Sequence, residues 1–84
     1  MSETIKKIMN LFAGAGINFT VKDNAIIVPD VDFKIFSVCD YNYIRLGAMS
    51  AHFSDAHVHN IEMMYDGRML DILLKNGADI SVIF

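Results

Sequence analysis

Three histidines, His52, His57 and His59, are the residues whose type and spacing point most directly to chemistry in this chain. Imidazole nitrogens bind zinc-type metals when several ligands converge within about 2.0–2.3 Å of one ion. If residues 56–65 form a strand, His57 and His59 share a face, and His52 or Asp55 then completes the site. If the segment is a helix, those two histidines lie about 200° apart around it and cannot share an ion. We favour the helix, so we predict no metal ligands and keep a metal-binding module as an alternative.

Cys39 is the single cysteine, and it serves as a nucleophile only if His57 or His59 lies within hydrogen-bond reach as its base. It follows Phe36 and Val38 in an expected strand, where a lone cysteine packs as a small hydrophobe. The chain also lacks a G-x-S-x-G nucleophile elbow and a phosphate-binding P-loop. We therefore predict a protein that is not an enzyme, with no catalytic residue and no cofactor.

The apolar composition predicts a surface that a partner covers. Hydrophobic residues make up 54% of a chain whose length, 84 residues, suits one domain over 1–84. A domain of this size buries only about 60–65% of the surface that its unfolded chain exposes. Its interior is too small for all of these side chains, so we expect some of them to be covered by a second copy or by another protein.

The cysteine count and the length of the apolar runs predict the compartment. A single cysteine cannot form an intramolecular disulfide, which favours a reducing compartment, most simply the cytoplasm. The longest apolar runs, AIIV and ISVIF, have the length of strands and fall far short of the roughly 18–20 residues that cross a bilayer. We expect no membrane contact.

The net charge of −3 is distributed unevenly along the chain. Residues 1–22 carry one acidic and three basic side chains, whereas residues 23–71 carry eight acidic and three basic ones. Nucleic-acid binding needs a basic surface, so the acidic middle segment predicts no direct contact with nucleic acid. The same segment would steer association with a basic protein, such as a nucleic-acid-binding protein or complex.

The first half of the chain predicts a helix followed by a sheet. Ser2 is a suitable N-cap, and the helix ends at Gly14 or Gly16, where glycine tolerates the left-handed conformation. Its apolar positions, at the spacing of one helical face, are Ile5, Ile8, Met9 and Phe12. From residue 17 the apolar period changes to two, which predicts an antiparallel meander over about 17–46, with the helix covering one face.

The second half fits two templates. The sequences YDGR and KNGA are hairpin signals. The segment between them, MLDILL, is rich in Leu and Met and poor in β-branched residues, which favours a helix. The predicted fold class is α+β, with an N-terminal helix, an antiparallel β-meander (about 17–46), a C-terminal helical segment (about 55–76) and a final edge strand (79–84).

Tyr41 and Tyr43, beside a predicted turn, are of the residue type that concentrates binding energy at interfaces. Acidic residues nearby in the chain would form the rim of such a surface. The predicted partner-binding residues are Asp30, Asp32, Asp40, Tyr41, Tyr43, Asp55, Glu62 and Asp66.

A small acidic chain without a catalytic centre fits an inhibitor or adaptor that binds a macromolecular target. Phages and mobile elements encode many such proteins, anti-CRISPR inhibitors of host defence complexes among them. By this analogy we expect a non-enzymatic protein that occludes a basic surface of its target. The alternatives are a metal-binding module built on histidines 52–59 and a homo-oligomeric structural subunit, with a homodimer as its simplest form.

Overall fold

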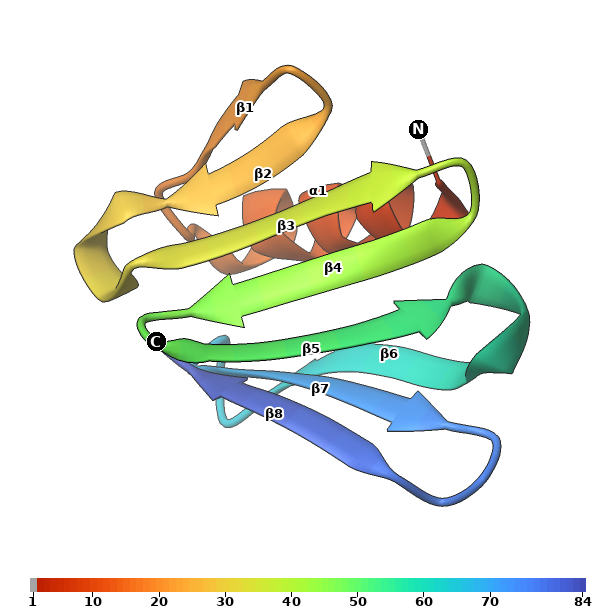
Figure 1. Cartoon of the computed structure of the whole chain (residues 1–84). Helices are drawn as coiled ribbons and strands as arrows, with labels where there is room; N and C mark the ends of the chain where they lie inside the picture. Colours follow the sequence, from red (N-terminus) through yellow and green to blue (C-terminus); the bar gives the residue numbers. More distant parts are fainter. Residues whose placement is uncertain (1) are drawn as a thin grey trace.

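The chain forms one α-helix and two antiparallel sheets in the computed structural model, which describes residues 2–84. The helix, α1, spans Glu3–Ala15, and the 3₁₀ turns η1 and η2 span Pro29–Val31 and Asp55–His57. The five-stranded sheet consists of β1 (Thr20–Lys22), β2 (Ala25–Val28), β3 (Phe33–Val38), β4 (Tyr41–Leu46) and β5 (Met49–Ser54). The three-stranded sheet consists of β6 (Val58–Met64), β7 (Met69–Leu74) and β8 (Asp79–Ile83). Figure 1 shows α1 behind the five-stranded sheet, and the three-stranded sheet on its β5 side.

The predicted N-terminal helix is confirmed. The Ile5 N–H donates a hydrogen bond to Ser2 Oγ at 3.1 Å, which satisfies one of the backbone donors that a helix start leaves free. The helix ends at Gly16, whose φ of 72° lies in the left-handed region. Its buried residues are Thr4, Ile5, Ile8 and Phe12. None of the helices in the described part of the chain has the length and apolar composition that a membrane span requires.

The predicted antiparallel meander is confirmed as well, and it continues through one more strand, β5. Ile26, Ile35 and Ile44 stand directly opposite one another on β2, β3 and β4, and all three are buried in the core that includes α1. Because side chains alternate along a strand, the residues between them point away from α1. The five-stranded sheet therefore has a covered inner face and an outer face that is open to solvent.

The predicted C-terminal helical segment over about 55–76 is wrong. These residues form η2, β6 and β7, and YDGR and KNGA are the turns on either side of β7. In β7, Leu70 and Ile72 are fully buried, while Asp71 between them points to the other face. Pairing with β6 on one side and β8 on the other outweighs the helical preference of its Leu and Met residues. The final edge strand is confirmed as β8, which belongs to the second sheet and not to the meander.

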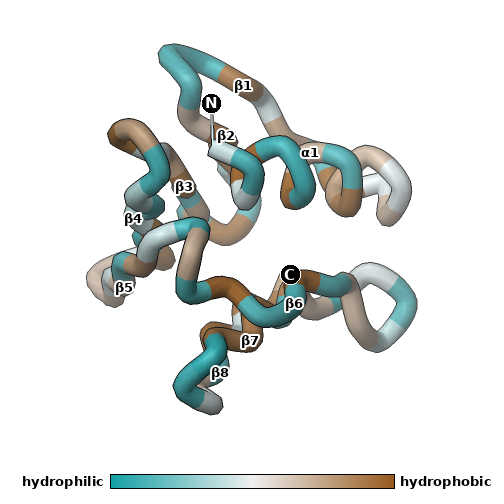
Figure 2. The backbone as a smooth tube through the Cα atoms, turned by 90° about the vertical axis from the view of Figure 1, so that its right-hand side faces the viewer, coloured by the Kyte–Doolittle hydropathy of each residue, from teal (hydrophilic) through white to brown (hydrophobic). Residues whose placement is uncertain are grey.

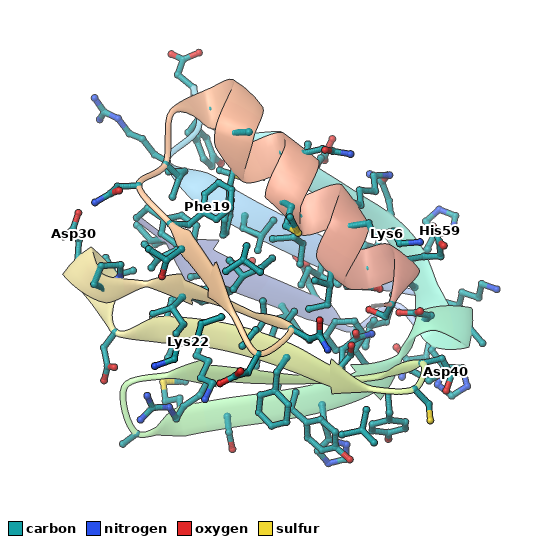
Figure 3. The ribbon with its side chains drawn as sticks, turned by 90° about the horizontal axis from the view of Figure 1, so that it is seen from above. Lys6, Phe19, Lys22, Asp30, Asp40 and His59 are labelled. Carbon is teal, nitrogen blue, oxygen red and sulfur yellow. The ribbon has the colours of Figure 1, made fainter. Side chains whose placement is uncertain are left out.

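The helix α1 joins the inner faces of both sheets into one hydrophobic core. It lies against β2 and β3 of one sheet and β6 of the other, as Figure 2 shows from the side. Phe12 of α1 is the centre of an aromatic cluster, with its ring centroid 5.2 Å from that of Phe84, 5.8 Å from Phe19 and 5.9 Å from Phe33. Phe19 lies between α1 and the strands in Figure 3. These contacts hold α1, β3 and the last residue of the chain together.

Gly67, in the turn between β6 and β7, lies directly against the end of α1. A Cβ added at Gly67 would lie 2.9 Å from the Cβ of Ala15, and the φ of 83° is strained for any residue with a side chain. We expect Gly67→Ala to lower the free energy of unfolding by about 1–3 kcal/mol through strain and by a similar further amount through overlap. Gly77→Ala is the control, because its φ is 89° but no atom lies within 4 Å of the added Cβ. Equal losses for the two variants in urea unfolding would contradict the role of the Ala15 contact.

Candidate binding surface

The structure separates the three histidines. His52 lies on the outer face of β5, His57 lies in η2, and His59 lies at a shift in the β6–β7 register. His52 and His57 line one surface pocket, whereas His59 lines another one beside α1. Residues 58–64 form a strand, but His57 precedes it and His59 lies at the register shift. The two histidines therefore do not share one face of a strand, as a metal site would require. Within residues 2–84 the side chains of His, Cys, Asp and Glu form no group of three or more that could hold a metal ion.

Cys39 is not in a strand, which corrects the sequence interpretation. It lies with Asp40 in the turn between β3 and β4, has a φ of 56° and is exposed. The thiol therefore does not pack in the core as a small hydrophobe.

The acidic residues of the predicted partner surface are spread over the molecule. Asp30 and Asp40 lie at opposite ends of the five-stranded sheet, as Figure 3 shows. Asp32 follows η1 near the first of these ends, and Arg45 Nη2 donates a 3.4 Å hydrogen bond to its carboxylate. The remaining members are Asp55, Glu62 and Asp66, from η2, β6 and the β6–β7 turn. The structure does not bring this set together into one surface.

Asp55 is used inside the fold. Its Oδ1 accepts hydrogen bonds of 2.7 Å from Thr4 Oγ1 and from Asn42 Nδ2, and its Oδ2 accepts one of 3.1 Å from the Glu3 N–H. Asn42 is fully buried, and its Oδ1 accepts a 2.7 Å hydrogen bond from Ser2 Oγ. Burial acts to raise the pKa of Asp55, but the hydrogen bonds from Asn42, Thr4 and the backbone of Glu3 and Thr4 together outweigh it and lower the pKa. Asp55 thus fastens the start of α1 to η2.

Tyr41 and Tyr43, in contrast, lie side by side on the outer face of β4, where two further rings join them. Phe36 of β3 stacks on Tyr43 with a centroid distance of 5.2 Å and an interplanar angle of 14°. Tyr41 lies 5.6 Å from Tyr43, and its hydroxyl shares a 3.1 Å hydrogen bond with Nδ1 of His52 on β5. Phe36, Tyr41 and Tyr43 are each 37–38% exposed. We call these four residues, Phe36, Tyr41, Tyr43 and His52, the aromatic face.

Three basic side chains lie on the same side of the sheet as the aromatic face. Lys22, Lys34 and Arg45 occupy strand positions on the same side of the sheet, and Lys34 Nζ lies 5.5 Å from the centroid of the Phe36 ring. Among the residues that the structure describes, no carboxylate occupies a strand position on this side. The carboxylates of strand residues gather on the outer side of the three-stranded sheet instead, at Glu62, Asp71 and Asp79. Folding therefore sorts the charges by face.

Sequence reasoning found the two tyrosines but missed Phe36, His52 and Lys34. The alternation along β3 carries a signal for two of them, because Lys34 and Phe36 alternate with Phe33 and Ile35, which are buried. That alternation marks a second face, with aromatic and basic character. Only the strand pairing brings His52 of β5 to the same face.

Comparisons with protein-family models, with curated proteins and with solved structures find no match to this chain. Its function is therefore inferred from its own surface.

Proposed function

We propose that this chain is a non-enzymatic binding protein whose contact surface is the aromatic face. The observation that carries the proposal is the set of four adjacent ring side chains on the solvent side of the sheet. Aromatic residues supply most of the binding energy at many interfaces, because they bury a large area and lose little conformational entropy. A protein that uses them only for stability would bury them, as this chain does with Phe12 and Phe33.

The sheet supports this role because it holds the rings rigidly. Phe36 and Tyr43 stand opposite each other on β3 and β4, and each of these strands has a paired neighbour on both sides. Their neighbours on the inner face, Ile35 and Ile44, are buried in the core. The surface is therefore formed before the partner arrives, which lowers the entropy cost of binding.

A reducing compartment, most simply the cytoplasm, is the proposed location. Cys39 is exposed, in a turn beside the aromatic face, and exposed thiols persist where disulfides do not form. The chain has no second cysteine to pair with it.

A second candidate function uses the outer face of the three-stranded sheet. Glu62, Asp71 and Asp79 on the outer face of the three-stranded sheet would occlude a basic surface of a target protein, as the charge of the sequence predicts. Hydrogen bonding with the neighbouring Asp71 carboxyl, together with its charge, raises the pKa of Asp79. A cationic partner would relieve the repulsion between Asp71 and Asp79. This favours the surface formed by Glu62, Asp71 and Asp79, which we call the acidic face, as the site that binds a basic target protein.

Affinity capture with three forms of the tagged protein distinguishes these functions. The forms are the wild type, the double variant Phe36→Ser with Tyr43→Ser, and the double variant Glu62→Gln with Asp79→Asn. Each is incubated with a lysate of the natural host, and bound protein and nucleic acid are identified by mass spectrometry and sequencing. We expect a stoichiometric partner that the wild type and the acidic-face variant retain and the aromatic-face variant loses.

Retention by the aromatic-face variant with loss by the acidic-face variant would replace the proposal with the second candidate. Retention by both would contradict both. Circular dichroism of each variant shows whether a loss reflects the surface or the fold, and the substitutions are at exposed positions where small stability changes are the norm.

A further inference from the structure

We infer that the occupant of the aromatic face is single-stranded nucleic acid. The inference rests on the proposed function and names the chemistry of the partner for the same surface. Three observations carry it: a row of rings with a pocket at one end, basic strand residues beside the row, and a second pocket that contains a lysine at its far end.

The row of rings, or ladder, has a pocket at the end beside Phe36. Lys22, Ala25, Phe36, Tyr43 and His52 stand directly opposite one another across all five strands. Strands lie about 4.8 Å apart, so this row spans about 19 Å. Ala25 carries no ring, and a shallow pocket lies here, with Ala25 and Ile27 among its lining residues and Phe36 at one side. A planar base entering this pocket would displace Lys34 Nζ from the Phe36 ring and continue the Phe36–Tyr43 stack, and every base has a face that can stack in this way.

The cations beside the ladder have the sign that a phosphate backbone needs. Lys22 and Lys34 line the pocket next to Phe36, together with Asp23 and Ser37. Lys34 and Arg45 stand directly opposite each other on β3 and β4. Like charges at opposed positions destabilise a sheet, and an anion between them relieves the repulsion. Arg45 is held only by an exposed 3.4 Å contact with Asp32, which is a weak competitor for a phosphate.

The far end of the ladder carries a second pocket with donors for an anion. Tyr41 and His52 line it from the sheet, and His57 and Lys75 line it from η2 and the end of β7. The rings of the aromatic face therefore lie between two pockets that each contain a lysine. A free nucleotide would occupy only one of them, whereas an extended strand reaches both and stacks its bases on the rings between them. Duplexes keep their bases paired and stacked, so the same rings discriminate against them.

The distribution of charge along the sequence predicts no direct contact with nucleic acid. The distribution of charge between the two sheets supports such a contact at the aromatic face. The acidic strand residues Glu62, Asp71 and Asp79 belong to the three-stranded sheet, and none of them is in the sheet that carries the row of rings. The net charge of −3 still repels a polyanion at long range, so binding should depend only shallowly on salt. Phosphate contacts with Lys22, Lys34, Arg45 and Lys75 predict a slope of about −3 for the logarithm of the association constant against that of the salt concentration.

Fluorescence anisotropy with labelled oligonucleotides tests the inference. The probes are poly(dT), poly(U) and a mixed sequence, each of about 12 nucleotides, the duplex of the mixed sequence, and a labelled mononucleotide. We expect the wild type to bind the single strands more tightly than the duplex or the mononucleotide. Phe36→Ala with Tyr43→Ala should weaken single-strand binding at least about tenfold. Lys22→Gln with Lys34→Gln should reduce the salt slope by about 1.4.

Lys6→Gln with Lys7→Gln is the matched control, because it removes the same charge from α1, and Lys6 lies on the far side of the molecule from Lys22 in Figure 3. This variant should bind like the wild type.

Equal binding of duplex, or single-strand binding that survives loss of the two rings, would overturn the inference. If no oligonucleotide binds but the aromatic-face variant still loses a protein in the affinity capture, the inference of a nucleic-acid partner is wrong and the proposed function stands. If the ring substitutions change neither result, both fail.

Discussion

Replacing Phe12 with alanine should remove a large share of the stability of this protein. Truncating a buried phenylalanine costs about 3–5 kcal/mol, through lost transfer free energy and the cavity that remains. At about 0.05–0.15 kcal/mol per residue, a chain of this length has a total of about 4–13 kcal/mol. Phe12 is fully buried, and its ring contacts Phe19, Phe33 and Phe84, so no single neighbour can collapse into the space that it leaves.

Urea unfolding followed by circular dichroism measures this loss. Leu11→Ala is the control, because Leu11 is the preceding residue of the same helix and is only partly buried. We expect the Leu11 variant to lose much less stability than the Phe12 variant. Comparable losses would contradict the role of the aromatic cluster, because alanine has a higher helix propensity than either residue that it replaces.

Removing the Asp55 carboxylate should also lower the free energy of unfolding strongly. Asp55→Ala leaves the hydroxyl of Thr4, the amide of Asn42 and the N–H of Glu3 without their acceptor. Asn42 is fully buried, and an unpaired buried polar group costs about 1–3 kcal/mol. With the contact of the buried Thr4 and the exposed contact of Glu3, we expect a total loss of about 2–4 kcal/mol in urea unfolding. Asp30→Ala is the control, because Asp30 is exposed and lies at the far end of the sheet from Asp40.

The pH dependence of the free energy of unfolding distinguishes the contribution of the Asp55 charge from that of its side-chain shape. The folded-state pKa of this carboxyl is lowered, so its contribution is fully present above the ordinary value of 3.8 and is lost as the pH falls through the folded pKa. We expect the stability difference between the wild type and Asp55→Asn to be constant near neutral pH and to shrink below about pH 4. A difference that stays constant down to about pH 2 would contradict the assignment of the lowered pKa to this residue.

The sequence predicts the first half of the fold because local signals and tertiary contacts agree there. Ser2 caps the helix, Ile5, Ile8 and Phe12 are buried on one helical face, and the period-two strands pair with their sequence neighbours. In the second half the local signals and the tertiary contacts conflict. MLDILL is apolar enough to form either element, and only its position between β6 and β8 decides for a strand. The hairpin signals on both sides were correct, and the intrinsic preference of Leu and Met was the misleading part.

The candidate surface shows the same division. Tyr41 and Tyr43 are conspicuous in the sequence, and they lie on the aromatic face. Asp55 is an equally conspicuous surface residue in the sequence, but its partners Thr4 and Asn42 are 51 and 13 positions away, so its internal role has no local signal. The sorting of charges by face depends on which residues stand opposite one another across five strands, and a count along the chain cannot contain that register.

The order of the strands also determines how the chain can find its structure. Every strand pairs only with a strand that precedes or follows it in the sequence, so both sheets can assemble from neighbouring hairpins without closing long loops. The contacts of Ser2 and Thr4 with Asn42 and Asp55 span 40 to 51 residues, and the ring contact between Phe12 and Phe84 closes a longer loop still. Strand pairing can therefore be fast, and the docking of α1 onto the completed strands is the step with the largest entropic barrier.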